Sequence, residues 1–134
     1  MGSIFTKIIN GDIPSVKVYE DQKCIAILDI NPNNKGHTLV IPKEEFETIL
    51  DCPQGLLDHL MSVAKKVAVK MNEELKCDGM NVVINNKEAA GQEIPHIHIH
   101  IIPRYKDDGH KHGYGHVKYE EGEMQKYGEM LRIT

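Results

Sequence analysis

The spacing of hydrophobic residues divides most of the chain into short predicted elements. Apolar residues at helical spacing predict a short helix at 4–9, which the turn-forming residues 10–14 end. Three β-branched or alternating runs follow at 16–19, 24–30 and 37–41, separated by polar stretches. Consecutive runs of this kind predict neighbouring antiparallel strands.

A hydrophobic stripe at helical spacing predicts one long amphipathic helix over residues 54–76, and we assign its methionines to core packing. Two further strands are predicted at 80–85 and 94–102, joined by a glycine-containing loop over 86–93, and Pro103 is expected to end the second strand. The pattern predicts an α+β fold: a five-stranded antiparallel sheet with one long helix and a short N-terminal helix.

The pattern changes after residue 104, where charged residues, glycines and histidines replace the hydrophobic runs. We expect a mobile loop over 104–115 and a short, helical segment near 122–133. The chain is expected to form a single domain, 1–134, with its core at about 3–104 and a C-terminal tail at 105–134. The H-x-H spacing in the tail could hold a metal, but we favour a glycine-rich loop for His110, His112 and His116.

Composition narrows the classes of function. A length of 134 residues suits one domain, and a net charge of −4 argues against a nucleic-acid partner. Three cysteines without a C-x-x-C pair cannot form a disulfide framework, which favours a reducing compartment. No apolar run approaches the ~18 residues of a membrane helix. We expect a cytoplasmic protein, with the nucleus as an alternative, and no membrane partner, because the N-myristoylation pattern at Gly2 lacks a basic cluster beside it.

The string from His96 to Ile102 carries the strongest chemical signal. Alternate residues of a strand point to one face, so His96, His98 and His100 should form a row with Cα spacings of ~6.5–7 Å. Such a row could chelate zinc, or one imidazole could attack an electrophile. The turn over residues 89–93 favours the second chemistry, because a glycine-bearing turn offers backbone N–H groups to an anion such as phosphate.

These residues resemble the signature of the histidine triad (HIT) family, His-φ-His-φ-His-φ-φ with φ hydrophobic, and the similarity extends through 4–14, 28–30 and 36–43. The resemblance implies nucleotide hydrolysis or transfer through a covalent nucleotidyl-histidine. By position, His98 would be the nucleophile and His96 would orient the row. The phosphate oxygens would be held by His100, by Asn85 and by backbone N–H groups near Gly91 and Gln92.

The resemblance also implies a nucleotide pocket and a quaternary structure. Asp29 would bind the ribose hydroxyls, and His37 would complete a base pocket whose apolar walls are Ile4, Phe5, Ile8, Ile27 and Ile30. Two subunits would join their sheets into a ten-stranded homodimer. No cofactor is implied.

Two matches favour one branch of the family, and two departures distinguish this chain from many of its relatives. Asn85 and the third histidine favour the Hint-like branch, whose reaction is hydrolysis of purine nucleoside 5′-phosphoramidates of the AMP-lysine type. Many bacterial relatives hold a structural zinc with two cysteines and a histidine where this chain has Ser3, Thr6 and Glu45, so we predict no metal site. Glu93 replaces the usual Ser or Thr and brings a carboxylate to the leaving group. The alternatives are a dinucleoside polyphosphate hydrolase, a weakly catalytic nucleotide-binding scaffold, and zinc binding by the triad.

Overall fold

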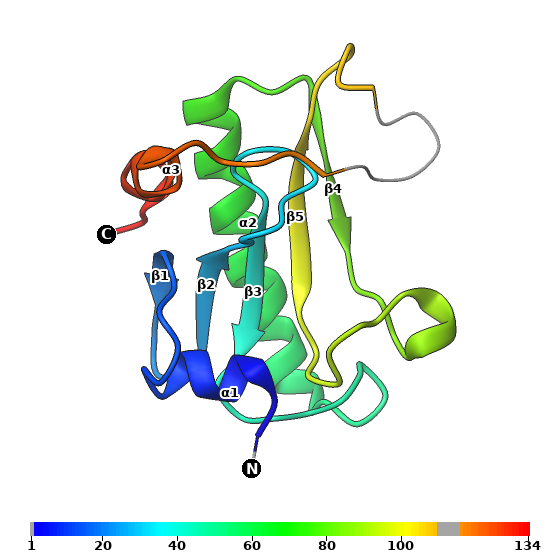
Figure 1. The fold of residues 1–134 in the computed structure, drawn as a ribbon. Coiled ribbons are helices and arrows are strands. Elements are labelled where there is room, and N and C mark those ends of the chain that lie inside the picture. Colours follow the sequence, from blue (N-terminus) through cyan, green and yellow to red (C-terminus); the bar gives the residue numbers. More distant parts are fainter. Residues whose placement is uncertain (1, 110–115) are drawn as a thin grey trace.

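A five-stranded antiparallel sheet carries the fold, as the hydrophobic pattern predicted (Figure 1). The computed structural model describes residues 2–109 and 116–134. The strand order is β1-β2-β3-β5-β4, so the last strand inserts between β3 and β4 and leaves β4 at an edge. The strands are β1 (Lys17–Glu20), β2 (Cys24–Leu28), β3 (Thr38–Pro42), β4 (Gly79–Val83) and β5 (Ile99–Arg104).

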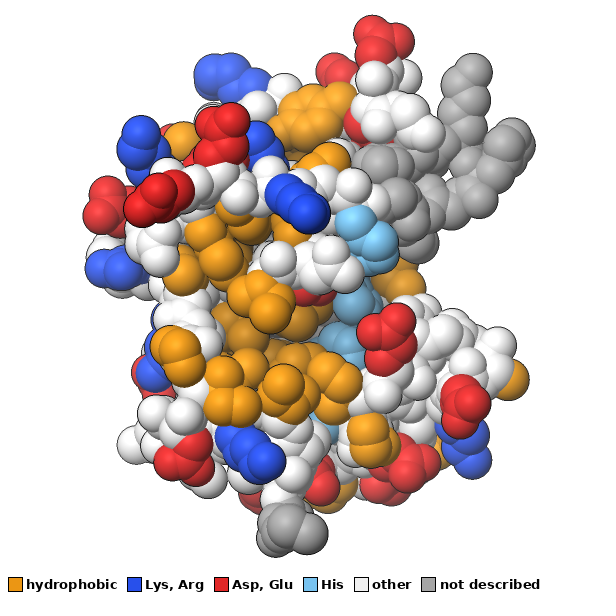
Figure 2. All heavy atoms as spheres, viewed as in Figure 1, with side chains coloured by type: hydrophobic (Ala, Val, Ile, Leu, Met, Phe, Trp, Pro, Cys, Tyr) orange, Lys and Arg blue, Asp and Glu red, His pale blue; other side chains and the backbone are white. Residues whose placement is uncertain are grey.

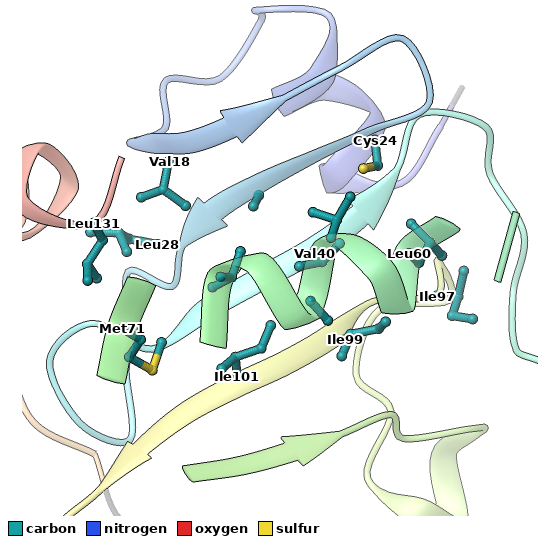
Figure 3. Packing of buried hydrophobic residues seen from close by; sticks show 14 of the residues in the cluster. Val18, Cys24, Leu28, Val40, Leu60, Met71, Ile97, Ile99, Ile101 and Leu131 are labelled. Carbon is teal, nitrogen blue, oxygen red and sulfur yellow. The ribbon is translucent and has the colours of Figure 1, made fainter. Parts of the chain in front are cut away.

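The predicted long helix is α2 (Gln54–Leu75), which covers one face of the sheet. Its buried residues recur at helical spacing and pack against alternate side chains of the central strands, among them Val40, Ile99 and Ile101 (Figure 3). Met71 is fully buried in this core, whereas Met61 is 45% exposed, so core packing explains only one of these two methionines. The helix residues in the core are Leu60, Val63, Ala64, Val67 and Met71.

The opposite face of the sheet is covered only in part, by α1 (Ile4–Ile9). Phe5 from this helix packs against Ile25, Ile27, Leu39 and Ile41, which alternate with the residues that face α2. Because strand side chains alternate between faces, β2 and β3 contribute to two separate apolar clusters. The uncovered remainder of this face is where the candidate site lies.

The last strand is shifted relative to the prediction of 94–102. β5 begins at Ile99, because the backbone before it bonds elsewhere: Ile97 donates to the Phe46 carbonyl at 2.7 Å. Pro103 does not end the strand. β3 pairs with β5 only as far as Ile101, so Pro103 pairs with β4 alone. The N–H that proline lacks therefore breaks no hydrogen bond between β5 and β3.

The tail contains the expected helix, α3 (Glu123–Leu131), which packs near α2 and β1. The chain after it returns to the sheet, where the Ile133 amide donates to the Val18 carbonyl at 2.7 Å. The expectation of a mobile loop falls partly on residues 110–115, and that part, with His110 and His112, lies outside the described residues. None of the described helices is both long and apolar enough to span a membrane.

Candidate active site

A cavity of about 420 Å³ opens on the face of the sheet opposite α2. Figure 2 shows the corresponding hollow, with histidine side chains along one wall beside a field of hydrophobic ones. All the predicted site residues line the cavity except His96 and Gln92. Those that do are Ile4, Phe5, Ile8, Ile27, Asp29, Ile30, His37, Asn85, Gly91, Glu93, His98 and His100.

The histidine row forms although its first two members precede β5. Ile97, Ile99 and Ile101 all point into the α2 core and are fully buried, which turns the histidines to the opposite face. Phe5 lies edge-on to two of them, with ring centroids 5.7 Å from His96 and 4.9 Å from His98. His96 has no exposed surface, so only the second and third histidines reach the cavity.

The hydrogen bond of His98 leaves its outer nitrogen free. Its Nδ1 lies 2.8 Å from the His96 carbonyl oxygen, which can only accept, so Nδ1 carries the proton and Nε2 keeps its lone pair. Burial lowers the pKa of His98 below its usual value, which keeps the ring neutral near pH 7. A neutral imidazole with an unprotonated Nε2 at a cavity wall has the state that a nucleophile requires.

A second chain of hydrogen bonds gives His100 the opposite tautomer from that of His98. The Asn33 amide donates to Nδ1 of His37 at 3.1 Å, so the His37 proton lies on Nε2. That Nε2 donates in turn to Nδ1 of His100 at 2.9 Å, which places the His100 proton on its own Nε2. Burial lowers the pKa of His37 to about 4 and that of His100 to about 3, so both rings are neutral. His100 therefore offers an N–H donor beside the His98 acceptor.

The wall around Asp29 combines a carboxylate with an apolar surface. Asp29 accepts the Asn31 amide on Oδ1 at 2.9 Å, and its Oδ2 lies 3.8 Å from Nε2 of His37. Ile4 and Ile30 are 47% and 81% exposed at the rim. Exposed aliphatic side chains next to a carboxylate can cover a flat apolar ring and accept hydrogen bonds from a diol.

The loop before the histidine row uses two of its amides for its own turn. Gly91, with φ +95°, donates to the Glu88 carbonyl at 2.9 Å, and the Gln92 amide donates to Lys87 at 3.1 Å. These two N–H groups have carbonyl partners within the loop, so a phosphate would have to compete for them, and a phosphate-binding role for the amides near Gly91 and Gln92 stays a prediction. The Gln92 side chain is buried and holds the loop together by donating to the carbonyls of Glu47 and Ile94.

Comparisons with known proteins place the chain in a family. The HIT domain family matches residues 10–107, which is most of the chain. The chain belongs to the HIT family. It is 50% identical over 115 residues to an uncharacterized HIT-like protein of Methanocaldococcus jannaschii, covering 86% of this chain and 88% of that one. A solved structure, a hypothetical histidine triad nucleotide-binding protein of Sulfolobus tokodaii, has a TM-score of 0.86 at 37% identity, covering 96% and 89%.

A relative with a named activity is also similar. The adenosine 5′-monophosphoramidase HNT1 of Saccharomyces cerevisiae is 43% identical over 101 residues, which cover 75% of this chain and 61% of that protein.

Several described cavity residues of this HIT protein were not identified from the sequence, among them a histidine of the tail. His116, from the tail, lines the cavity and its Nδ1 lies 3.0 Å from the Asn31 carbonyl oxygen. The tail passes over the β2–β3 connection, where Tyr119 accepts the Gly36 amide at 2.7 Å. No local pattern relates residue 116 to residue 31, so only the tertiary structure could place this histidine.

Among the described residues, two groups of side chains bring metal-ligating atoms within 4.8 Å of one another. Asp29, His37 and His100 form one group, and their types suit zinc, although their hydrogen bonds already fix both imidazoles. The other group is Asp21, Cys24 and His59. Its carboxylate already accepts Tyr19 and is 2.7 Å from Nε2 of His59, so a metal would have to displace these contacts.

Proposed function

We propose that this HIT protein is a nucleotide-binding hydrolase that cleaves purine nucleoside 5′-phosphoramidates of the AMP-lysine type through a nucleotidyl-His98 intermediate. The observation that carries the proposal is the pairing of opposite tautomers: an acceptor Nε2 on His98 beside a donor Nε2–H on His100, both facing one cavity. The name of the yeast relative, a monophosphoramidase, supports the same substrate class.

The chemistry proceeds in two displacements at phosphorus. The His98 Nε2 lone pair forms a bond to the α-phosphorus while the phosphorus–nitrogen bond to the amine breaks, and the amine leaves with an added proton. Water then attacks the same phosphorus, the bond to Nε2 breaks, and the nucleoside monophosphate is released. His100 donates its Nε2–H to a phosphate oxygen as charge develops, and Asn85 at the cavity wall supplies a second donor.

Proton transfer to the amine requires an acid in the cavity. Within the described parts of the chain, two carboxyl groups line it, Asp29 and Glu93. We assign Asp29 to the ribose hydroxyls and the exposed isoleucines around it to the base. Glu93 is then the carboxyl group left to give a proton to the leaving amine and to take one from the attacking water.

The quaternary structure and location belong to the same proposal. β4 is an edge strand, and Val82 on it is 45% exposed. An unpaired strand edge with an exposed apolar side chain favours pairing with a second copy, which would give a homodimer with a ten-stranded sheet. We propose that this homodimer acts in the cytoplasm.

A steady-state assay with an adenosine phosphoramidate and a diadenosine polyphosphate, side by side, tests the proposal. The wild type should hydrolyse the phosphoramidate. His98→Asn should lose turnover by at least about a thousandfold while AMP binding and melting temperature stay close to wild type, because the change is confined to the cavity. Turnover of the polyphosphate alone would show that the protein is a dinucleoside polyphosphate hydrolase and would overturn the proposed phosphoramidate reaction. AMP binding without turnover of either substrate would identify a nucleotide-binding scaffold.

A further inference from the structure

The polar cluster behind the histidine row has no part in the reaction described above. Ser3 is the N-cap of α1, and its Oγ accepts the Thr6 amide at 3.2 Å. The same Oγ lies 2.6 Å from Nδ1 of His96, which is 93 residues away in the chain. One hydroxyl therefore joins the first helix to the first histidine of the row.

Glu45 fixes the position of this hydroxyl. Its Oε1 accepts the Ser3 amide at 2.7 Å and the Thr6 hydroxyl at 2.9 Å. Both donors hold the pKa of Glu45 below its usual value, so the group is a carboxylate. A carboxylate that binds the first amide and the first-turn hydroxyl of a helix completes its N-terminus from a distant segment. Ser3 is thus held from two sides.

The two hydrogen bonds of His96 specify one tautomer. Its Nε2 lies 2.9 Å from the Pro42 carbonyl oxygen, which requires a proton on Nε2. Nδ1 is then an acceptor, and the Ser3 hydroxyl is its donor. Burial lowers the pKa of His96, in agreement with a neutral ring. Without this hydroxyl, a fully buried nitrogen would have no donor among the described contacts.

The orientation of His96 matters to the nucleophile, because the carbonyl of His96 accepts Nδ1–H of His98. Residues 94–98 lie outside the strand ladder, so the sheet does not hold this carbonyl. Its orientation depends on the side chain of its own residue, on the His96 amide, which donates to the Ile94 carbonyl at 2.8 Å, and on the Ile97 amide, which donates to Phe46.

We propose that Ser3, held by Glu45, is a positioning residue that locks His96 and thereby sets the tautomer of His98. The inference deepens the function proposed above by adding a residue outside the cavity. The Ser3–Thr6–Glu45–His96 cluster then affects catalysis without contacting the substrate.

Three substitutions of Ser3 separate the positioning role from helix capping. Ser3→Ala removes both the cap and the donor to His96. Ser3→Gly also removes the donor but keeps an acceptable N-cap. Ser3→Thr keeps both functions. Ser62→Ala, on the exposed face of α2, is a matched control.

The first readout is the ¹⁵N chemical shift of the ring nitrogens in labelled protein without nucleotide, which reports tautomers directly. In Ser3→Ala and Ser3→Gly, His96 and His98 should show mixed tautomers, and Ser3→Thr and Ser62→Ala should match wild type. The second readout is kinetics with the adenosine phosphoramidate. We expect kcat about tenfold lower in the Ala and Gly variants, KM within about twofold, and recovery in Ser3→Thr.

Unchanged nitrogen shifts in Ser3→Gly would overturn the inference, even if its melting temperature falls, because the cluster would then only stabilise the helix. Wild-type kcat in both variants would overturn it too. If the wild-type protein hydrolyses no phosphoramidate, the proposed function fails, and the shifts of the nucleotide-free protein still decide the positioning role.

Discussion

Acidic pH should destabilise this protein through His37, because the ring is buried as a neutral base. Its side chain is 2% exposed, and burial is the main cause that lowers its pKa from 6.5 to about 4. The unfolded chain therefore binds the proton more readily than the folded one. The contribution of neutral His37 to the free energy of unfolding is fully present above pH 6.5 and is lost as the pH falls towards 4. At pH 5 the loss from this residue amounts to about 2 kcal/mol.

The assay is urea unfolding of the wild type and His37→Gln at pH 7.5 and at pH 5.0, followed by circular dichroism. The glutamine amide takes up no proton in this range, so the free energy of unfolding should fall less in the variant, by about 2 kcal/mol. Protonation of groups that do not contact residue 37 contributes equally to both proteins and cancels in the comparison. An identical pH dependence in the two proteins would refute the reasoning that His37 is held neutral between Asn33 and His100.

Two further substitutions test the edge strand and the cavity wall. Val82→Lys should convert a dimer to a monomer in sedimentation experiments without loss of the fold, because a charged side chain on an exposed edge disfavours strand pairing; wild type that sediments as a monomer would contradict the proposed assembly. Glu93→Gln should lower kcat for the adenosine phosphoramidate by about a hundredfold, because the amide can neither give a proton to the leaving amine nor take one from water. Wild-type kcat in this variant would show that another group is the acid.

The periodic parts of the fold were predictable from the sequence. The helical stripe of α2 and the alternation of histidine and isoleucine are local patterns, and each has one way to bury its apolar side. The pattern did not locate the start of β5, because the backbone of Ile97 bonds to Phe46, about 50 residues before it, rather than to a neighbouring strand.

The cavity was predictable to a similar extent. The resemblance to the HIT family identified most of its lining residues, but it assigned the Gly91 and Gln92 amides to the phosphate, whereas the loop uses them for its own turn. Competition between a loop and a ligand for the same amide is decided by the folded geometry, which no motif records.

The sequence by itself therefore determined the order of the main helices and strands, which face of the last strand carries the imidazoles, and which family the chain belongs to. Only the tertiary structure decided the protonation pattern that makes those imidazoles useful. His37 donates to His100, and Ser3 donates to His96, across separations of 63 and 93 residues. The physical reason is that side-chain periodicity depends on neighbours in the chain, whereas a tautomer depends on whichever donor or acceptor the packed chain brings within about 3 Å.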